Sequence, residues 1–326
     1  MWLRLWLVID GVVALCSLAD VVSSTGRWSR IVAIGDIHGD KLALEECLRV
    51  AKVVDASGRW TGESGTLVLS LGDILDRGHE DWQCLKLLHR LKNEARASQS
   101  DVGMVLGNHE LENVRNPRIG DAFVSYEAAL DVQRELFPLD DPLEARKKAF
   151  APGGPAASVL ADLCGETPIV RIEGDTVFVH AAIDLGDSGE IAEFIQVQRG
   201  MRGATDIRVQ DLLDTSSLEN VIRTVNSCAR DLLCADSVQE RDRPRYMDDG
   251  RGCADPRAAD PQILGCNRVV AGHNIQFYGI NNNIGGTIYR IDTGMSRFVI
   301  NGQIAVLELC VDAFSGFAPG LTAADM

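Results

Sequence analysis

Three short segments of this chain consist almost entirely of metal ligands, glycine and a phosphate-binding arginine. Each follows an apolar run: Gly35–Asp40 carries Asp and His, Gly72–Gly78 carries two Asp and an Arg, and Gly107–Glu110 carries Asn, His and Glu. Oxygen ligands mixed with imidazole nitrogen suit manganese, iron or zinc better than calcium. A shared carboxylate can hold two such ions about 3.5–4 Å apart, and the pair acidifies a bridging water to hydroxide. The residue types therefore predict a two-metal site that hydrolyses phosphate esters.

Histidines extend this set beyond the three segments. One histidine at a strand end is more often a structural residue than a metal ligand. In this chain, four of the six histidines directly follow strand-like apolar runs, beside small or amide residues: His38, His109, His180 and His273. Four such positions, together with the acids of the three segments, predict one shared site.

Arg77 and His109 supply chemistry that metal ligands do not. The planar guanidinium of Arg77 matches phosphate oxygens, although a surface salt bridge with Asp76 or Glu80 is the alternative. His109 directly follows the ligand Asn108 and cannot easily bind the same ion. We therefore assign His109 as the general acid for the leaving oxygen. Asp76 could hold its imidazole and favour the protonated form.

The overall charge limits the class of partner. The chain has 326 residues, a formal net charge of −15 and a pI near 4.8. Nucleic-acid binders usually carry a basic surface, so this balance argues against nucleic acid and against attraction to anionic membranes. A phosphate site in such a protein must supply its positive charge locally, from metal ions and arginine.

The pattern of apolar runs predicts how these residues are positioned. Strands and helices alternate in the first third of the chain, which indicates a parallel sheet with helices on its faces. Loops at the carboxyl ends of such strands are where open α/β folds bind ligands. The expected strands are 31–34, 66–71 and 102–106, and the expected helices are 41–53 and 80–98.

The later part of the chain is expected to add strands around a polar insertion. Residues 111–165 read as mixed helix and loop, and residues 184–262 as a helical cap or insert. A hairpin and a further strand should lead into His180 and His273. The expected strands are 169–172, 176–179, 268–271, 287–292, 297–300 and 304–311.

The N-terminus has a composition of its own. Arg4 precedes an apolar run over residues 5–22, which is typical of a signal peptide, or less so of a signal anchor, over residues 1–23. Asp10 inside the run favours the alternative, a buried strand or helix. A leader would direct the protein to the secretory pathway or out of the cytoplasm; without one, it would be cytoplasmic or organellar. No other run is long enough for a membrane helix, so no stable membrane insertion is expected after leader removal.

Four of the nine cysteines lie close together in the polar segment, at Cys228, Cys234, Cys253 and Cys266. In an oxidising compartment they could form two disulfides in three possible pairings. In a reducing compartment they would be free thiols. The sequence leaves both alternatives open.

The motifs resemble those of the phosphoprotein phosphatase family of metallophosphoesterases. That family's signature is Gly-Asp-x-His-Gly, Gly-Asp-x-x-Asp-Arg-Gly and Gly-Asn-His-Glu, followed by two histidines, and all five elements occur here in order from Gly35 to His273. The chain is most similar to the bacterial-like branch called Shewanella-like phosphatases. Its Gly-Asp-Ile-His-Gly-Asp motif, Pro152–Pro155 and Arg290–Ser296 carry that similarity, which covers about residues 30–310.

The resemblance implies a fold and a metal centre. The fold would be α/β, a central β-sandwich flanked by helices with the two metal ions at the strand ends. The catalytic domain would span residues 30–312, with the insert at 184–262 and a tail at 313–326. The first ion would be held by Asp36, His38 and Asp73. Asp73 would bridge to a second ion, whose other ligands would be Asn108, His180 and His273. Manganese is the expected metal, with iron or zinc as alternatives.

The resemblance also implies the catalytic roles. Arg77 and Asn108 would bind phosphate, and His109, paired with Asp76, would be the general acid. The family usually has a second phosphate-binding arginine between the last two histidines. Three candidates lie in that stretch: Arg241, Arg243 and Arg245.

The expected function is that of a serine/threonine phosphoprotein phosphatase acting on phosphorylated proteins, with tyrosine preference left open. The alternative is a nucleotide or dinucleoside-polyphosphate hydrolase. That relative usually lacks the Asp of the second motif and ends the third in Asp, so Asp76 and Glu110 favour the protein phosphatase. A third hypothesis is a metal-binding scaffold without activity. The chain lacks the Ser-Ala-Pro-Asn-Tyr type segment of common eukaryotic members, which argues against their standard regulatory subunits.

Overall fold

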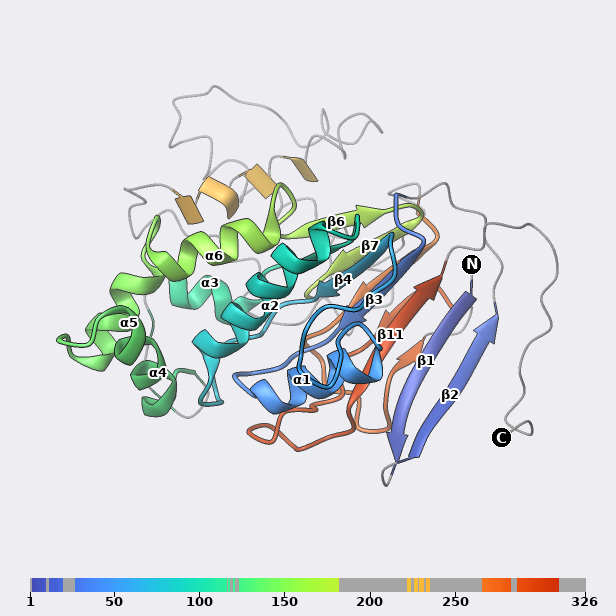
Figure 1. The fold of residues 1–326 in the computed structure, drawn as a ribbon, viewed down its shortest axis with the longest axis horizontal. Coiled ribbons are helices and arrows are strands. Elements are labelled where there is room, and N and C mark those ends of the chain that lie inside the picture. Colours follow the sequence, from blue (N-terminus) through green and yellow to red (C-terminus); the bar gives the residue numbers. More distant parts are fainter. Residues whose placement is uncertain are drawn as a thin grey trace, which may run out of the picture.

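The computed structural model describes residues 27–115, 123–181, 266–282 and 286–310, the strands at 2–9 and 12–19, and single residues at 117, 120 and within 222–234. Two β-sheets lie at its centre, with helices packed beside them (Figure 1). The predicted α/β sandwich is therefore confirmed. None of the described helices is long and apolar enough to cross a membrane.

The first sheet contains the three strands whose ends carry the motifs. Its order is β2-β1-β11-β3-β4-β5, and β3, β4 and β5 run parallel, as the sequence predicts. β11 joins the edge of β3 antiparallel, followed by β1 and β2. The strands are β1 (Trp2–Ile9), β2 (Val12–Ala19), β3 (Arg30–Ile34), β4 (Thr66–Ser70), β5 (Asp101–Met104) and β11 (Ala305–Cys310).

The second sheet carries the two later histidines at its strand ends. Its order is β6-β7-β8-β10-β9; β7, β8 and β10 run parallel, and the two edge strands run antiparallel to their neighbours. The strands are β6 (Val170–Glu173), β7 (Thr176–Val179), β8 (Arg268–Ala271), β9 (Asn281–Asn282) and β10 (Ile288–Arg290).

Alternation along the strands explains how the first sheet packs on both faces. In β3, Ile31 and Ala33 belong to the cluster between the two sheets, whereas Val32 and Ile34 belong to the cluster under the helices. Side chains on a strand point alternately to opposite faces, so one short apolar run can serve two cores. From the second sheet, Phe178 enters the cluster between the sheets.

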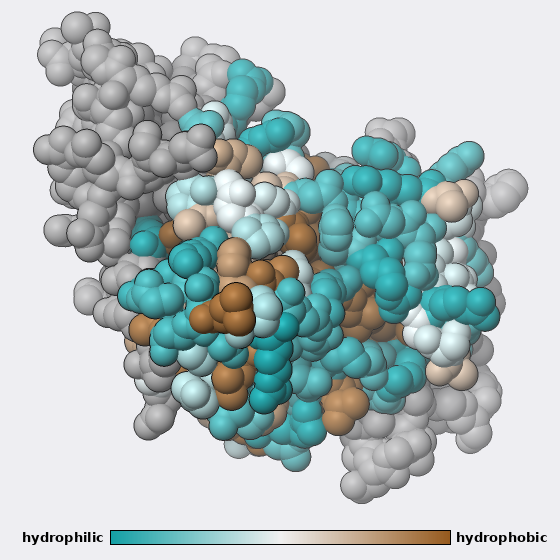
Figure 2. Space-filling model, turned by 60° about the vertical axis from the view of Figure 1, so that its left-hand side comes forward, coloured by the Kyte–Doolittle hydropathy of each residue, from teal (hydrophilic) through white to brown (hydrophobic). Residues whose placement is uncertain are grey.

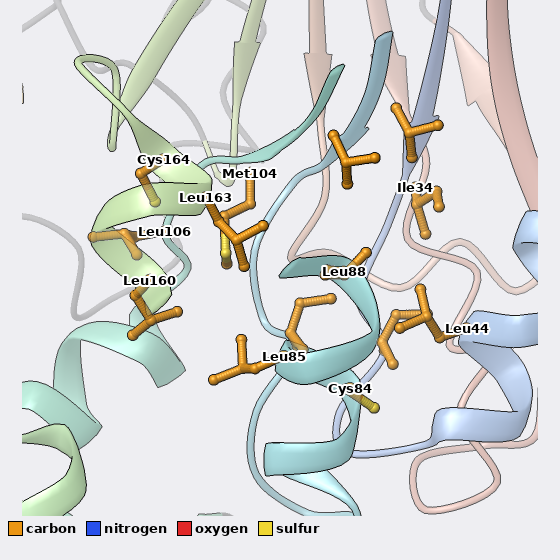
Figure 3. Packing of buried hydrophobic residues seen from close by; sticks show 14 of the residues in the cluster. Ile34, Leu44, Cys84, Leu85, Leu88, Met104, Leu106, Leu160, Leu163 and Cys164 are labelled. Atoms are coloured by element: carbon orange, nitrogen blue, oxygen red, sulfur yellow. The ribbon is translucent and has the colours of Figure 1, made fainter. Parts of the chain in front are cut away.

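Helices α1 (Lys41–Val50) and α2 (Asp81–Arg96) cover the outer face of the first sheet. Leu85 and Leu88, three residues apart on α2, lie on the buried side of that helix (Figure 3). Leu44 of α1 is buried in the same cluster. Asp40 caps α1, because its carboxylate accepts the N–H of Ala43 at 3.1 Å. Each helix begins within a few residues of a motif, so the packing of the helix on the sheet also positions the motif loop.

A helical layer extends from the end of the sheets formed by the motif loops. It consists of α3 (Asn108–Arg115), α4 (Tyr126–Leu136), α5 (Pro142–Phe150) and α6 (Pro155–Cys164). Ser125 caps α4, Asp141 caps α5, and proline starts both α5 and α6, where its missing N–H costs nothing. The exposed surface at this end is mostly hydrophilic with small apolar patches (Figure 2).

One predicted strand is corrected by the structure, and the predicted N-terminal leader, insert and tail remain predictions. The strand expected at 297–300 is wrong: these residues form a turn, because the N–H groups of Val299 and Asn301 both bond to the carbonyl of Ser296. Residues 2–9 and 12–19 form a hairpin on β11, in agreement with the alternative of an N-terminal strand. A leader at 1–23, and the bounds of the insert at 184–262 and the tail at 313–326, stay predictions that fall largely outside the described residues.

Candidate dimetal active site

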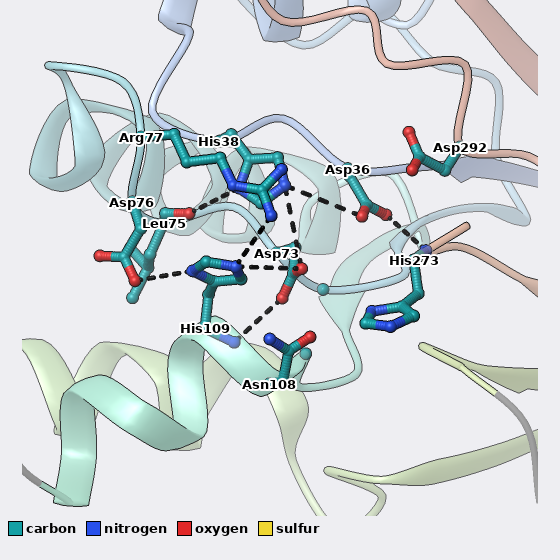
Figure 4. A network of polar contacts seen from close by, with 12 residues as sticks. Asp36, His38, Asp73, Leu75, Asp76, Arg77, Asn108, His109, His273 and Asp292 are labelled. Atoms are coloured by element: carbon teal, nitrogen blue, oxygen red, sulfur yellow. Dashed lines mark hydrogen bonds and ion pairs between the residues drawn. The ribbon is translucent and has the colours of Figure 1, made fainter. Parts of the chain in front are cut away.

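The three motif loops meet at one edge of the first sheet because β3, β4 and β5 are parallel neighbours. The second sheet brings the ends of β7 and β8 to the same place. All six predicted metal ligands converge there: Asp36, His38, Asp73, Asn108 and His273, which Figure 4 labels, and His180, whose Nε2 lies 3.0 Å from Nδ1 of His273. The predicted ligands that lie far apart in the sequence are thus brought together.

Asp73 stands at the centre of the site. Its Oδ2 lies 3.3 Å from Nε2 of His180 and 3.9 Å from Nε2 of both His38 and His109. These side chains define two overlapping groups with metal-ligand spacing, one containing His38, Asp73 and His109, the other Asp73, His180 and His273. A carboxylate shared by two ligand groups is what a two-metal site requires.

Backbone carbonyls decide which nitrogen each histidine presents. Nδ1 of His38 lies 3.0 Å from the carbonyl of Leu75, and Nδ1 of His180 lies 2.7 Å from the carbonyl of Leu71. A carbonyl can only accept, so Nδ1 carries the proton in both rings. Nε2 of each ring then faces Asp73 with its lone pair available, which is the orientation that metal-binding histidines use.

The second ligand group brings nitrogen and oxygen donors within metal-ligand spacing. Nε2 of His180 lies 3.0 Å from Nδ1 of His273 and 3.1 Å from Oδ1 of Asn108. Although burial disfavours a charged ring, the Asp73 carboxylate raises the pKa of His180 to about 10. These ring nitrogens and the amide oxygen, gathered around the Asp73 carboxylate, can together take up a proton or a metal ion. The donor set fits the divalent metal that the sequence predicts.

Asp36 and Asp292 form the acidic side of the site. Oδ1 of Asp36 accepts the backbone N–H of His273 at 3.0 Å, and Oδ2 lies 3.9 Å from Nε2 of His38. Burial and the nearby Asp292 raise the pKa of Asp36. Sequence reasoning noted Arg290–Ser296 only as part of the resemblance and assigned nothing to Asp292. The signal was there, since Asp292 also follows a short apolar run.

His109 and Arg77 lie beside the metal ligands. Nδ1 of His109 is 2.8 Å from Oδ2 of Asp76, and Nε2 is 3.5 Å from the Arg77 guanidinium. Burial opposes a charged imidazole, but the carboxylates of Asp73 and Asp76 outweigh it and raise the pKa of His109. Among the described residues no ion pair joins Arg77 to Asp76 or Glu80, so the alternative of a surface salt bridge is not observed.

The loops hold these side chains in a strained backbone. Five site residues other than glycine have φ between 47° and 69°, a left-handed conformation that costs L-residues about 1–2 kcal/mol each: His38, Asp73, Asp76, Arg77 and His273. The buried Glu110 carboxylate compensates by accepting four backbone N–H groups at 2.8–3.2 Å, from Asp73, Ile74, Leu75 and Gly107. Sequence reasoning used Glu110 only to separate related families and missed this role.

Sequence reasoning also missed a buried polar group behind Asp76. Asp81, Asn113 and Arg146 are each at most 1% exposed and contact Asp76 or its hydrogen-bond partners. None of the three belongs to a motif with recognisable spacing. The candidates for a second phosphate-binding arginine, Arg241, Arg243 and Arg245, lie outside the described residues, as do Cys228 and Cys253.

Comparison with known families identifies the chain. Residues 29–200, more than half of its length, match the family model described as calcineurin-like phosphoesterase. The chain belongs to the calcineurin-like phosphoesterase family. This phosphoesterase is therefore a hydrolase acting on phosphoric monoesters, and its family implies divalent metal ions, for which the structure offers candidate ligand groups.

Relatives of this phosphoesterase agree with the resemblance that the motifs indicate. It is 29% identical to Shewanella-like protein phosphatase 2 of Arabidopsis thaliana over 320 residues, covering 87% of this chain and 76% of the relative. It is 26% identical to Shewanella-like protein phosphatase 1 of Plasmodium berghei (strain Anka), covering 85% of this chain and 70% of the relative.

A solved structure shares the fold. The cold-active protein-tyrosine phosphatase of a psychrophilic Shewanella species aligns with a TM-score of 0.52 and 18% identity. The alignment covers 88% of this phosphoesterase and 85% of that chain. At this identity the likeness concerns the fold alone, and it supports the predicted sandwich.

Proposed function

We propose that this phosphoesterase is a phosphoprotein phosphatase that acts on phosphoserine and phosphothreonine. The observation that carries the proposal is the His109–Asp76 pair beside Arg77, a proton donor next to a phosphate-binding guanidinium. The alkoxide of serine or threonine is a much poorer leaving group than the phenolate of tyrosine. It therefore depends more on a proton donated to the leaving oxygen. The names of the relatives, Shewanella-like protein phosphatases, support a protein substrate.

The residues at the strand ends fit two divalent ions. Asp36, His38 and Asp73 would hold one, and Asp73 would share the other with Asn108, His180 and His273. When bound, the ions would supply Lewis acidity toward phosphoryl oxygens and an acidified water. Manganese suits this mixture of oxygen and nitrogen ligands, with iron or zinc as alternatives.

Around the metal ligands, the chain's own groups would bind phosphate and move one proton. The Arg77 guanidinium and the Asn108 amide would bind phosphoryl oxygens and orient the ester. Nε2 of His109 would donate its proton to the leaving oxygen, while Asp76 holds the ring through Nδ1. His109 also has metal-ligand spacing with His38 and Asp73. Arg77 lies 3.5 Å from its Nε2.

Rates on matched substrates test the proposal. Manganese-loaded protein should hydrolyse phosphoserine and phosphothreonine peptides with a higher kcat/KM than a phosphotyrosine peptide of the same sequence. It should also prefer them to diadenosine tetraphosphate, the substrate of the alternative function. A preference for either of the latter would contradict the proposal, and bound metal without turnover would support the scaffold hypothesis.

A further inference from the structure

A buried polar cluster lies behind Asp76, on the side away from His109. We call Asp76, Asp81, Asn113 and Arg146 the Asp76 support cluster. Nη2 of Arg146 donates to Oδ1 of Asp76 at 2.9 Å and to Oδ2 of Asp81 at 2.6 Å. Nε of Arg146 donates to Oδ1 of Asn113 at 2.7 Å, and Nδ2 of Asn113 donates to Oδ1 of Asp76 at 2.9 Å. The cluster is thus a closed ring of hydrogen bonds.

Arg146 has no access to water, which is unusual for an arginine. Its side chain is 0% exposed, its Nη1 lies 3.4 Å from the carbonyl of Ala128, and its guanidinium stacks 4.9 Å from the ring of Phe150. Burying a charge costs several kcal/mol, on the order of a small protein's whole stability, unless the charge is paired and fully hydrogen-bonded. A hydrophobic residue of the same volume would serve packing equally well. The presence of arginine therefore calls for a reason beyond packing.

The cluster fixes both oxygens of the Asp76 carboxylate. Oδ1 is held by Arg146 and Asn113, so only Oδ2 remains to accept the proton of His109 Nδ1 at 2.8 Å. Asn113 also donates to the backbone carbonyl of His109 at 2.9 Å, and the backbone N–H of Asp76 donates to Asp81 at 3.0 Å. The carboxylate can neither rotate nor lean away from the imidazole. The Arg146 guanidinium pairs with both carboxyl groups.

We propose that Arg146 is a positioning residue for hydrolysis: its guanidinium orients the Asp76 carboxylate and balances its charge, so that His109 stands ready to protonate the leaving oxygen. The inference rests on the proposed function, because it requires His109 to be the proton donor. Arg146 comes from α5, which touches α3 and α4 but supplies no residue to the metal groups. Its effect would pass only through Asp76.

The leaving group separates this role from a merely structural one. Phosphoserine needs a proton on its leaving oxygen, whereas the 2,4-dinitrophenolate ion leaves without one. Arg146→Met should lower kcat for a phosphoserine peptide about 10- to 100-fold, a part of the roughly 10²–10⁴-fold contribution of a general acid. For 2,4-dinitrophenyl phosphate the loss should stay below about threefold, and KM should stay near the wild-type value for both substrates. Arg146→Lys, which keeps the charge but not the fork, should recover part of the lost rate.

Two reference variants calibrate the comparison. Asp76→Asn removes the acceptor itself and should show the same substrate dependence with a larger loss. Arg30→Met removes another ion-paired arginine, whose Nε lies 2.8 Å from Glu308 where β3 pairs with β11. It should change both rates by the same small factor. If Arg146→Met does not fold, Arg146→Met/Asp81→Asn removes the acid left unpaired and should show the same substrate dependence.

The outcomes separate this inference from the proposed function. Wild-type protein inactive on both substrates would overturn the proposed function, and the inference with it. If Asp76→Asn slows both substrates equally, His109 is not the acid and the inference falls. If Asp76→Asn distinguishes the substrates while Arg146→Met or the double variant slows both equally, or neither, then only the role of Arg146 is overturned. Metal content measured on every variant shows that the metal ligands are intact.

Discussion

The motif loops and the helical layer behind them build one active site by different means. In the loops, backbone geometry holds the ligands: His38 and Asp73 take left-handed conformations, and Glu110 accepts four N–H groups of the loop backbone, that of Asp73 included. In the helical layer, Arg146 stands on an ordinary α-helix and acts through its side chain alone. The metal-ligand side of the site depends on the backbone conformation of the loops. The side behind Asp76 depends on a side chain from α5.

This difference explains why the two regions differ in how visible they are in the sequence. A tight turn that places a ligand demands glycine, Asp or Asn at fixed spacing, so it leaves a motif. A helix that presents one side chain to a cluster demands only that residue, and its neighbours are free to vary. The predictions below test whether substitutions in the loops act through the backbone and substitutions in the helical layer act through side-chain contacts.

The largest effect is expected at the shared ligand of the loops. Asp73→Asn should lower kcat by more than about 100-fold, since even residues that only orient metal ligands commonly cost 10- to 100-fold. The cause is the weakened carboxylate common to both ligand groups. Elemental analysis should show metal loss beside the loss of turnover. Glu127→Gln, at an exposed position in the first turn of α4, is the control and should leave activity unchanged; a fully active Asp73→Asn protein would place the site elsewhere.

A methyl group added at Gly107 tests how closely the loop backbone must approach Asp73. A Cβ at Gly107 would lie 2.0 Å from Oδ1 of Asp73 and 2.6 Å from its backbone nitrogen. Gly107→Ala should therefore displace Asp73 and lower kcat about 100-fold, as a shift of about 1 Å in a reacting group can. Gly120→Ala, where a Cβ meets nothing within 4 Å, is the matched control. Equal rates for both variants would show that the loop has room to adjust.

The support beneath the loops is tested at Glu110. Glu110→Gln replaces one carboxylate oxygen by an amide N–H₂ group, which would face two of the backbone donors instead of accepting from them. We expect the free energy of unfolding to fall by about 3 kcal/mol, because each unsatisfied donor costs about 1–3 kcal/mol. Urea denaturation measures the change. Exposed Glu144→Gln is the control, and a loss no larger than its loss would mean that Glu110 does not hold the loops.

The helical layer is tested through the pH dependence of stability. Burial and the charge of Asp76 raise the pKa of Asp81 to about 6, although Arg146 opposes the shift. The folded state therefore keeps a proton that the unfolded chain releases near pH 4, and the resulting stability is lost as pH rises through about 6.

Asn at position 81 cannot lose a proton, so Asp81→Asn should not show this loss. The unfolding free energy of wild-type protein relative to Asp81→Asn should fall by about 2–3 kcal/mol between pH 4 and pH 7. Urea denaturation of both proteins at the two pH values gives the difference, and groups that do not contact Asp81 cancel. A difference that does not change with pH would mean that Asp81 titrates normally.

Much of the fold and nearly all of the metal-ligand side of the site could be predicted from the sequence. The runs before Asp36, Asp73, Asn108, His180 and His273 are short and apolar, and strands or loops indeed deliver these residues to one edge. The strand predicted at 297–300 is a turn, although the apolar run Phe298–Ile300 is typical of a strand. In the fold, the N–H and guanidinium of Arg297 bind the Asp40 carboxylate, which no local pattern reveals.

The sequence by itself determined the residues that can bind metal and phosphate, because local turns and strand ends impose glycine, Asp and His at fixed spacing. It also predicts His109 as the proton donor, since His109 directly follows the predicted ligand Asn108. Only the tertiary structure decided which histidine nitrogen faces Asp73, because backbone carbonyls remote in sequence hold the rings. It alone decided that Arg146 reaches Asp76, since that contact joins residues 70 positions apart in the chain and depends on how α5 packs rather than on any spacing.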